Sequence, residues 1–197
     1  MKKAIILGHG GHAKVIHSFI FDQYDNVQFF DEQAEAKVFA DPKSFQNVDF
    51  YLGIGSNAVR KKLYLKLKQA GLNLPICLGP NAVIVKEAQI GQGSFVGAGS
   101  FVMAGAVVGE NVIINTLSSV DHDCKVGDHA QITAGVTLGG ASEIGENCFL
   151  GLKVTVLPGI KIGNNTQVMA GSVATKDIEA NLVVGGYPVR VIKASES

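Results

Sequence analysis

Residues 120–144 read VDHDCKVGDHAQITAGVTLGGASEI, and within them an aliphatic residue returns at every sixth position. This period continues without insertion from residue 78 to residue 173, and all sixteen leading residues are aliphatic. The fourth residue is glycine or asparagine in ten of the sixteen hexads. Glycine and asparagine accept the positive φ of a tight corner, whereas an α-helix needs apolar residues about every 3.6 positions and is weakened by glycine. The period therefore predicts short strands joined by corners.

Such a chain is expected to form a solenoid. Three strand-and-corner units close one triangular coil of eighteen residues, the leading aliphatic residues point inward, and successive coils stack through ladder hydrogen bonds. Because each coil advances by about one strand spacing, roughly 4.8 Å, residues eighteen apart in the chain become neighbours along the axis.

The first 75 residues have a different pattern. Alternating apolar segments predict strands at residues 2–8, 26–32 and 48–55 and helices at residues 12–21 and 57–71. Strands that alternate with helices indicate a small parallel α/β sheet. We therefore expect two domains: a small Rossmann-like domain over residues 1–75, and a β-helix with a C-terminal loop and tail over residues 76–197.

Composition excludes several functions. Lysine plus arginine and aspartate plus glutamate both total 17, so no broad basic field exists to attract nucleic acid or an anionic membrane. The N-terminal apolar run of four residues is too short for a signal peptide or a membrane span, so a cytoplasmic protein is expected. The three cysteines lack CxxC spacing and are expected to be reduced thiols.

A glycine-rich turn lies between the first predicted strand and helix. Residues 8–13, GHGGHA, fit GxGxxA, and Asp31 follows about twenty residues later. The region has room for one such half, which favours a single nucleotide or nucleotide-sugar over a hydride-transfer cofactor. Lys14 would neutralise phosphate, and Asp31 or Asn57 would bond the base or ribose. Arg60 and Lys61 are expected on a solvated helix face. The alternative is a turn that serves only helix packing.

His122 lies at a corner of the predicted solenoid. Val120 and Cys124 keep the inward positions, so His122 and Asp123 face outward, and Cys124 is a small core residue. Residue 140, eighteen positions later, is a glycine whose backbone N–H would lie beside the histidine. A general base next to an exposed amide donor suits acyl transfer, with Asp121 or Asp123 orienting the imidazole. The alternative is a solvated surface histidine.

The segments GHGGHAKV, NTLSSVDHDCKVGDHAQITAGVTLGG, NCFLG and GGYPVRVIK, together with the hexads, make the whole chain resemble the NeuD/PglD-type sugar O- and N-acyltransferases. The nearest likeness is to bacterial enzymes that acetylate the 4-amino group of a UDP-4-amino-4,6-dideoxy-N-acetylhexosamine for glycan synthesis. The resemblance implies a left-handed parallel β-helix, a homotrimer, a UDP-amino-sugar in the small domain, and acetyl-CoA as co-substrate between neighbouring subunits.

The resemblance also assigns residues. It makes His122 the general base, favours Asp123 as its acidic partner, and makes Gly140 the glycine whose amide faces the thioester carbonyl. Near the nucleotide-sugar it places Gly10, Gly11, His12, Asp31, Glu32 and Asn57. Near the CoA it places Leu152, Ala170, Pro188 and Arg190.

One position departs from the family. Many relatives carry a second histidine near the acetyl group where this chain has Gln131, and His129 is not assigned that role. Acetyl transfer is expected to survive if His122 is sufficient. Three alternatives stay open: acetylation of a sialic-acid or other sugar hydroxyl, a zinc enzyme of related fold, and a non-catalytic scaffold that binds a nucleotide-sugar. No metal is expected, because the repeats contain only two histidines.

Overall fold

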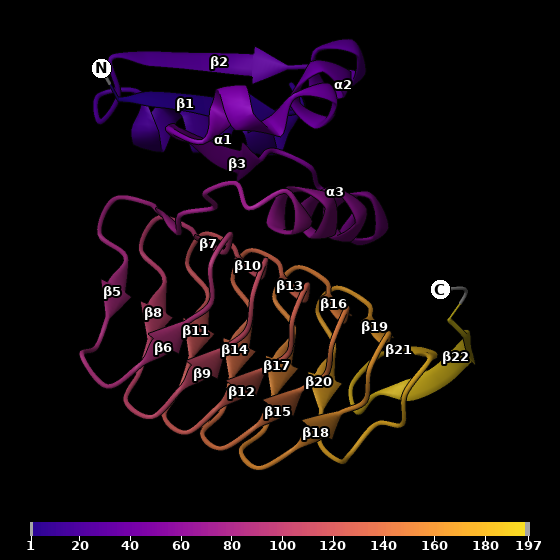
Figure 1. Cartoon of the computed structure of the whole chain (residues 1–197). Helices are drawn as coiled ribbons and strands as arrows, with labels where there is room; N and C mark the ends of the chain where they lie inside the picture. The colour runs from indigo at the N-terminus through magenta and orange to yellow at the C-terminus, as the bar shows by residue number, and fades with distance from the viewer. Residues whose placement is uncertain (1, 196–197) are drawn as a thin grey trace. The chain divides into compact units, whose positions relative to one another are not determined.

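A computed structural model describes residues 2–195, which divide into two compact units with the boundary between Cys77 and Leu78 (Figure 1). The first unit is a parallel α/β structure and the second is a β-solenoid, so the predicted fold class is confirmed. None of the helices formed by residues 2–195 is long and apolar enough to cross a membrane.

The first unit is built on a three-stranded parallel sheet with the order β2-β1-β3. Its strands are β1 (Lys3–Leu7), β2 (Asn26–Phe30) and β3 (Val48–Leu52). Its helices are α1 (Gly11–Ile20), α2 (Glu32–Ala40) and α3 (Asn57–Gln69), with a 3₁₀ turn at Pro42–Phe45. Helix α2 was not predicted. Its start is marked by Asp31, whose carboxylate accepts a hydrogen bond from the Ala34 N–H at 2.8 Å.

Close packing of α1 against the sheet explains one glycine of this unit. Ala13, Ile16 and Ile20 form the buried face of α1. A Cβ at Gly53 would overlap Ala13, so only glycine lets the chain after β3 approach the helix this closely. The loops that follow β1 and β3 are thereby held near the start of α1.

The solenoid has three faces, and its strands pair with strands eighteen residues away, as in Ile113↔Gln131 and Ser119↔Thr137. The first face contains β4 (Cys77–Leu78), β7 (Phe95–Val96), β10 (Ile113–Ile114), β13 (Gln131–Ile132), β16 (Phe149–Leu150), β19 (Gln167–Val168), β21 (Leu182–Gly185) and the antiparallel β22 (Arg190–Ala194). The second face contains β5 (Val83–Ile84), β8 (Phe101–Val102), β11 (Ser119–Val120), β14 (Thr137–Leu138), β17 (Thr155–Val156) and β20 (Val173–Ala174). The third face contains β6 (Gln89–Ile90), β9 (Val107–Val108), β12 (Lys125–Val126), β15 (Glu143–Ile144) and β18 (Lys161–Ile162).

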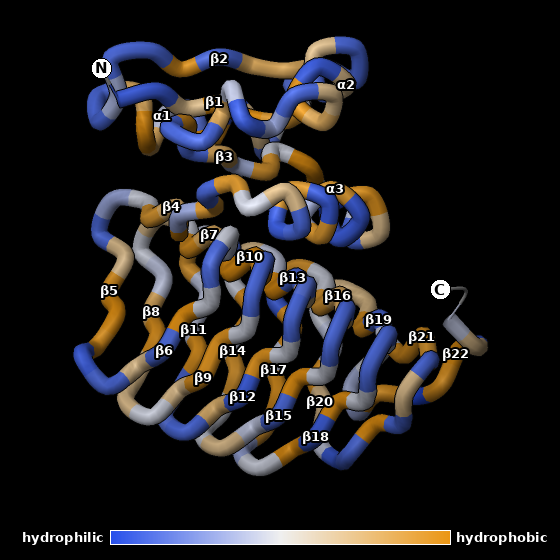
Figure 2. The backbone as a smooth tube through the Cα atoms, viewed as in Figure 1, coloured by the Kyte–Doolittle hydropathy of each residue, from blue (hydrophilic) through white to orange (hydrophobic). Residues whose placement is uncertain are grey.

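The inside of the solenoid is filled by the leading residues of the hexads. Val120, Ile132 and Leu138 are fully buried, and Figure 2 shows hydrophobic residues following the strands of all coils. Leu78 departs from the expectation: it is 47% exposed, because the first coil has no coil before it to cover its side chain. Small polar residues at the fifth position bond the next coil, as when the Ser118 hydroxyl donates to the Thr133 carbonyl at 2.8 Å.

One corner column, between the second and third faces, positions the site. We call it the His122 edge; over residues 102–162 its fourth-position residues are Gly105, Asp123, Ala141 and Gly159. All four have positive φ, between 57° at Ala141 and 73° at Gly159. The edge therefore keeps the same backbone conformation from coil to coil, while the side chains at the corner differ.

Candidate active site

His122 and Asp123 form a dyad in the turn between β11 and β12. The His122 Nδ1 lies 2.9 Å from Asp123 Oδ2. A carboxylate can only accept a hydrogen bond, so Nδ1 carries the proton and Nε2 is left as the basic atom of the neutral ring. Both side chains are more than half exposed, which leaves Nε2 accessible to a ligand. The dyad thus has the chemistry of a general base with an orienting acid.

Asp121 has a different role from Asp123. Its Oδ1 accepts the backbone N–H of His122 at 2.7 Å, so it stabilises the turn rather than the ring. The hydrogen bond that His122 donates to Asp123 raises the pKa of His122 above its ordinary value, and the nearby charge of Asp121 adds to the shift. The two alternatives left open by the sequence therefore separate: Asp123 bonds the imidazole, and Asp121 bonds the backbone.

Gly140 lies one coil beyond His122. A Cβ at this position would lie 2.5 Å from His122 Nε2, so only glycine leaves space for the imidazole. The N–H groups of its neighbours are used: Gly139 donates to Val156 O at 2.9 Å, and Ala141 donates to His122 O at 2.8 Å. The Gly140 N–H has no protein acceptor within residues 2–195. An unoccupied amide donor therefore lies beside the basic nitrogen.

The residues expected near CoA occupy other parts of the solenoid. Leu152 and Ala170 lie on the corner column between the first and second faces, eighteen residues apart, and both are exposed. Gln131 is on β13 of the first face, and Pro188 and Arg190 lie at the start of the C-terminal β22 hairpin arm. A single chain thus brings His122, Asp123 and Gly140 together, and it does not bring the expected CoA residues to them.

In the first unit, a pocket of about 570 Å³ lies at the carboxyl edge of the sheet. It contains Asp31 and Glu32, two of the residues expected near the nucleotide-sugar, Gly8 and His9 of the glycine-rich turn, and three residues that the sequence reasoning missed: Glu35, Lys62 and Lys66. Burial raises the pKa of the Glu35 carboxyl, Lys66 opposes this shift, and Glu32 adds to it. The pocket therefore combines acidic acceptors with two cationic donors.

The other residues predicted to bind the nucleotide-sugar do not line this pocket. Gly10 is the N-cap of α1, and a Cβ added at Gly10 or at Gly11 would have no neighbour within 4 Å, so the backbone there is open. Burial and the charge of Arg60 lower the pKa of His12 to about 4, which makes it neutral at physiological pH. Lys14 is exposed on α1.

Asn57 and Arg60 differ from the sequence interpretation. The Arg60 Nη2 donates to the Asn57 side-chain oxygen at 3.1 Å, so part of the bonding capacity of Asn57 is used within α3. Arg60 was expected on a solvated helix face, and this expectation is wrong: the residue is 1% exposed. Arg60 lies on the same face of α3 as the buried residues Leu63 and Tyr64. One charged residue does not make an otherwise apolar helix face solvent-exposed.

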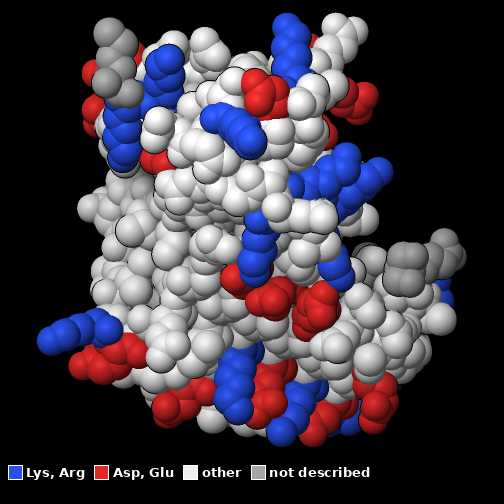
Figure 3. Space-filling view, viewed as in Figure 1, with Lys and Arg blue, Asp and Glu red and all other residues white. Residues whose placement is uncertain are grey.

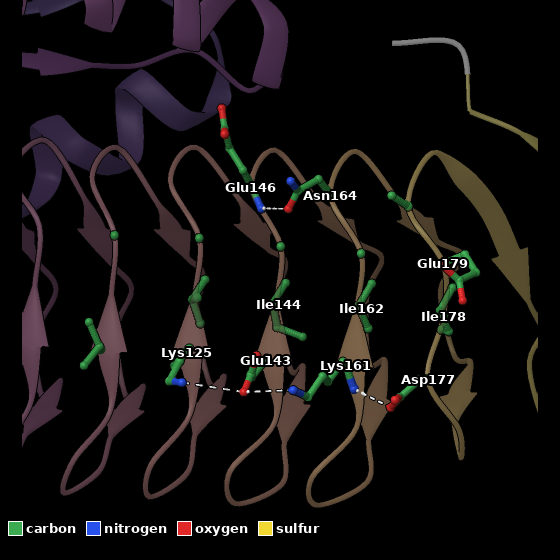
Figure 4. A pocket seen from close by; sticks show the side chains of 17 residues that line it. Lys125, Glu143, Ile144, Glu146, Lys161, Ile162, Asn164, Asp177, Ile178 and Glu179 are labelled. Carbon is green, nitrogen blue, oxygen red and sulfur yellow. Dashed lines mark hydrogen bonds and ion pairs between the residues drawn. The ribbon is translucent and has the colours of Figure 1, made fainter.

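A hollow of about 800 Å³ runs along the third face of the solenoid and contains none of the predicted site residues. Charges alternate in this part of the molecule (Figure 3). In the close-up, Glu143 lies between Lys125 and Lys161, with ion pairs of 3.6 and 3.4 Å (Figure 4). The floor of this hollow includes glycines because a Cβ there would overlap the next coil. A Cβ at Gly145, for example, would overlap Asn164. Coil packing alone explains this groove.

The alternative of a zinc enzyme gains no support from the histidines. Within residues 2–195, no three side chains of His, Cys, Asp or Glu are grouped to hold a metal ion. His129 is 5% exposed, and its Nδ1 lies 2.9 Å from the Asn111 amide nitrogen. It occupies a corner column that elsewhere holds Asn111, Asn147 and Asn165, so it has a structural position.

The pKa shift of His122 predicts a pH dependence. A base must be neutral to accept a proton, so activity should rise with pH through the pKa of His122. Asn at position 123 cannot stabilise the imidazolium, so Asp123→Asn should lower this pKa and move the acidic limb of kcat to lower pH. Asp123→Asn should also reduce the high-pH plateau of kcat by about tenfold or more, because ring orientation is part of the ~10²–10⁴-fold that a general base contributes. A pH profile that keeps its acidic limb would contradict the dyad.

Models of known protein families match both units of the chain. The PglD N-terminal domain matches residues 3–67. The bacterial transferase hexapeptide model, six repeats long, matches residues 105–140, and the hexapeptide repeat of succinyl-transferase matches residues 88–116 and 143–176.

Solved structures match over nearly the whole length. The acetyltransferase domain of PglB from Neisseria gonorrhoeae FA1090, in complex with acetyl coenzyme A, is 29% identical with a TM-score of 0.92, covering 97% of this chain and 99% of that chain. PerB from Caulobacter crescentus, in complex with CoA and GDP-perosamine, is 29% identical with a TM-score of 0.90, covering 96% of each chain. WeeI from Acinetobacter baumannii AYE shares the fold at 22% identity, with a TM-score of 0.88 over 96% of this chain and 99% of that chain.

The solenoid, the dyad at its edge and the repeat matches define a hexapeptide-repeat transferase. The PglD N-terminal domain precedes these repeats, and over nearly its whole length the chain is similar to the acetyltransferase domain of PglB and to PerB. The resemblance drawn from the sequence is thereby confirmed.

Proposed function

We propose that the protein transfers the acetyl group of acetyl-CoA to the amine of a nucleotide-linked 4-amino sugar. The observation that carries this proposal is the His122–Asp123 dyad beside the open amide of Gly140. A basic nitrogen and an amide donor at one point are the two groups that attack on a thioester requires. The neighbouring structures with acetyl-CoA, and with CoA and GDP-perosamine, support the donor and the acceptor class.

The reaction proceeds in a ternary complex without an acyl-enzyme. The neutral sugar amine attacks the thioester carbonyl carbon while His122 Nε2 accepts the proton that the amine loses. The Gly140 N–H stabilises the oxyanion of the tetrahedral intermediate. When the C–S bond breaks, the imidazolium returns its proton to the departing sulfur, so CoA leaves as a thiol and His122 is again neutral. Asp123 stabilises the imidazolium between the two proton transfers.

Acetyl-CoA lies between neighbouring copies of the chain in a homotrimer. The support for this is geometric: His122 is on one edge of the solenoid, and Leu152 and Ala170 are on another, with the second face between them. One acetyl-CoA molecule contacts both sets of residues when the His122 edge of one subunit packs against the edge of its neighbour that contains Leu152 and Ala170.

The nucleotide part of the acceptor binds in the first unit, at the pocket formed by Asp31, Glu32, Glu35, Lys62 and Lys66. We propose a uridine diphosphate sugar, a 4-amino-4,6-dideoxy-N-acetylhexosamine, as the acceptor. PerB was solved with a GDP-linked amino sugar, so the nucleobase of the acceptor is the variable to test. The Watson–Crick edge of uracil offers one N–H, whereas that of guanine offers two donors on adjacent groups, and a pocket carboxylate can accept from either.

A thiol-release assay tests the proposal. Acetyl-CoA is supplied with a panel of UDP- and GDP-linked 4-amino sugars of gluco and galacto configuration, and with sialic acid. We expect rapid CoA release with a UDP-linked amino sugar, and mass spectrometry should show one added acetyl group on its nitrogen. Turnover only with the GDP sugar would show that the nucleobase of the acceptor is guanine and not uracil. Turnover only with sialic acid would show that the reaction is O-acetylation and not N-acetylation. Binding of nucleotide-sugar without CoA release from any member would favour a scaffold.

A further inference from the structure

We propose that Gly105 is a positioning residue for the general base: it seats the Asp123 carboxylate so that the carboxylate can hold the His122 ring. The inference rests on the proposed function, because the reaction that it serves is acetyl transfer with His122 as the base. Gly105 lies one coil before Asp123 on the His122 edge and touches no reacting atom.

The first observation is a steric one. A Cβ at Gly105 would overlap Asp123 Oδ1, which lies over the glycine Cα in the space that any other residue would fill. The other carboxylate oxygen, Oδ2, is the atom that bonds His122 Nδ1 at 2.9 Å. The backbone of Asp123 is fixed to the same coil, because its N–H donates to the Ala104 carbonyl at 3.0 Å. The Asp123 carboxylate thus packs against Gly105 of the preceding coil through Oδ1 and bonds the imidazole through Oδ2.

The second observation is that the backbone alone does not require glycine here. Ala141 occupies the equivalent corner with φ 57°, so this edge accepts a residue with a Cβ at positive φ. Gly159, also equivalent, has φ 73°, and a Cβ there would have nothing within 4 Å. Gly105 has φ 71°, and only at Gly105 does the neighbouring side chain occupy the space. The glycine is therefore explained by Asp123.

Two glycines then flank the dyad, one on each neighbouring coil. Gly140, on the coil after, leaves space for the imidazole, and Gly105, on the coil before, leaves space for the carboxylate. A dyad whose side chains are both exposed has few packing contacts to fix it, so these two close approaches supply its orientation.

The test is Gly105→Ala. The new methyl group should displace the Asp123 carboxylate and break its hydrogen bond to His122. We expect kcat to fall about tenfold or more, approaching the loss caused by Asp123→Asn, since both variants remove ring orientation from the ~10²–10⁴-fold general-base contribution. The acidic limb should move to lower pH, and KM for acetyl-CoA and for the sugar should change less than twofold.

Gly159→Ala is the matched control, because it places the same methyl group at the same φ on the same edge with open space around it. It carries the same backbone strain and should keep both kcat and the pH profile. A double-mutant cycle adds a second control: in an Asp123→Ala background the overlap is gone, so Gly105→Ala should cause no further loss of kcat.

A Gly105→Ala enzyme with wild-type kcat and pH profile would overturn the proposal. So would an equal loss of kcat in the Asp123→Ala background, or an equal loss in Gly159→Ala, since either result assigns the effect to the fold. NMR titration of the His122 imidazole separates this inference from the proposed function. If the wild-type protein acetylated nothing, a pKa lowered in Gly105→Ala and unchanged in Gly159→Ala would still support the role of Gly105, and an unchanged pKa in both would refute it.

Discussion

Replacing His122 with asparagine should lower kcat for acetyl transfer by about 10²–10⁴-fold, the range that a positioned general base contributes. Asparagine keeps a polar side chain at the corner and cannot take the proton that the amine loses on attack. KM for acetyl-CoA should change little, because the imidazole contacts the reacting atoms and not the body of the donor. Initial rates of CoA release with saturating acceptor, measured across pH, give both quantities, and the acidic limb assigned to His122 should vanish.

The chain offers a matched control in His129→Asn. His129 is buried in a corner column whose other members include Asn111, Asn147 and Asn165, so asparagine suits that position. This variant should fold and turn over as the wild type does. If His122→Asn kept near wild-type kcat with its fold intact, or if His129→Asn lost as much activity, the assignment of the base would fail.

A methyl group at position 140 should be nearly as damaging. In Gly140→Ala, the Cβ would lie 2.5 Å from His122 Nε2, so the imidazole must leave its position beside residue 140. Alanine keeps the backbone N–H, so the loss of kcat comes from displacement of the base, which contributes about 10²–10⁴-fold.

The fold should survive this change, because Ala104 occupies the equivalent position one coil before His122 and shows that the corner accepts alanine. Thermal unfolding of Gly140→Ala should therefore resemble that of the wild type, while CoA release with the preferred acceptor falls. Wild-type kcat in Gly140→Ala would show that the position of the His122 ring does not matter as proposed.

The solenoid could be predicted in detail because its period is short and strict. Every leading aliphatic residue from Ile84 onward is at the end of a strand, and the eighteen-residue rule predicted that Gly140 lies beside His122. The rule worked because ladder hydrogen bonds fix the register of one coil on the next. The same rule failed to choose between Asp121 and Asp123, because that choice depends on side-chain rotamers at one turn.

The residues of the pocket in the first unit could be predicted only in part. Asp31 and Glu32 were found because they follow the second predicted strand, but helix α2 was missed and Glu35 with it. Lys62 and Lys66 are four residues apart on α3, a spacing that puts both on one side of a helix; the pattern was visible, but nothing in it indicated which side faces the pocket. For Arg60 the prediction was wrong in the opposite direction: its charge indicated an exposed position, and the residue is buried.

The register that joins His122 to Gly140 also limits how such a protein can change in length. Whole coils can be added or lost at either end of the solenoid without disturbing the pair, provided that the coils of Gly105, His122 and Gly140 are kept. A single residue inserted within a strand between them would shift the pairing by one and present Gly139 to the imidazole, and a single deletion would present Ala141. Variation in length is therefore tolerated at the termini of the repeat array and forbidden along the seventeen residues that separate the base from its amide.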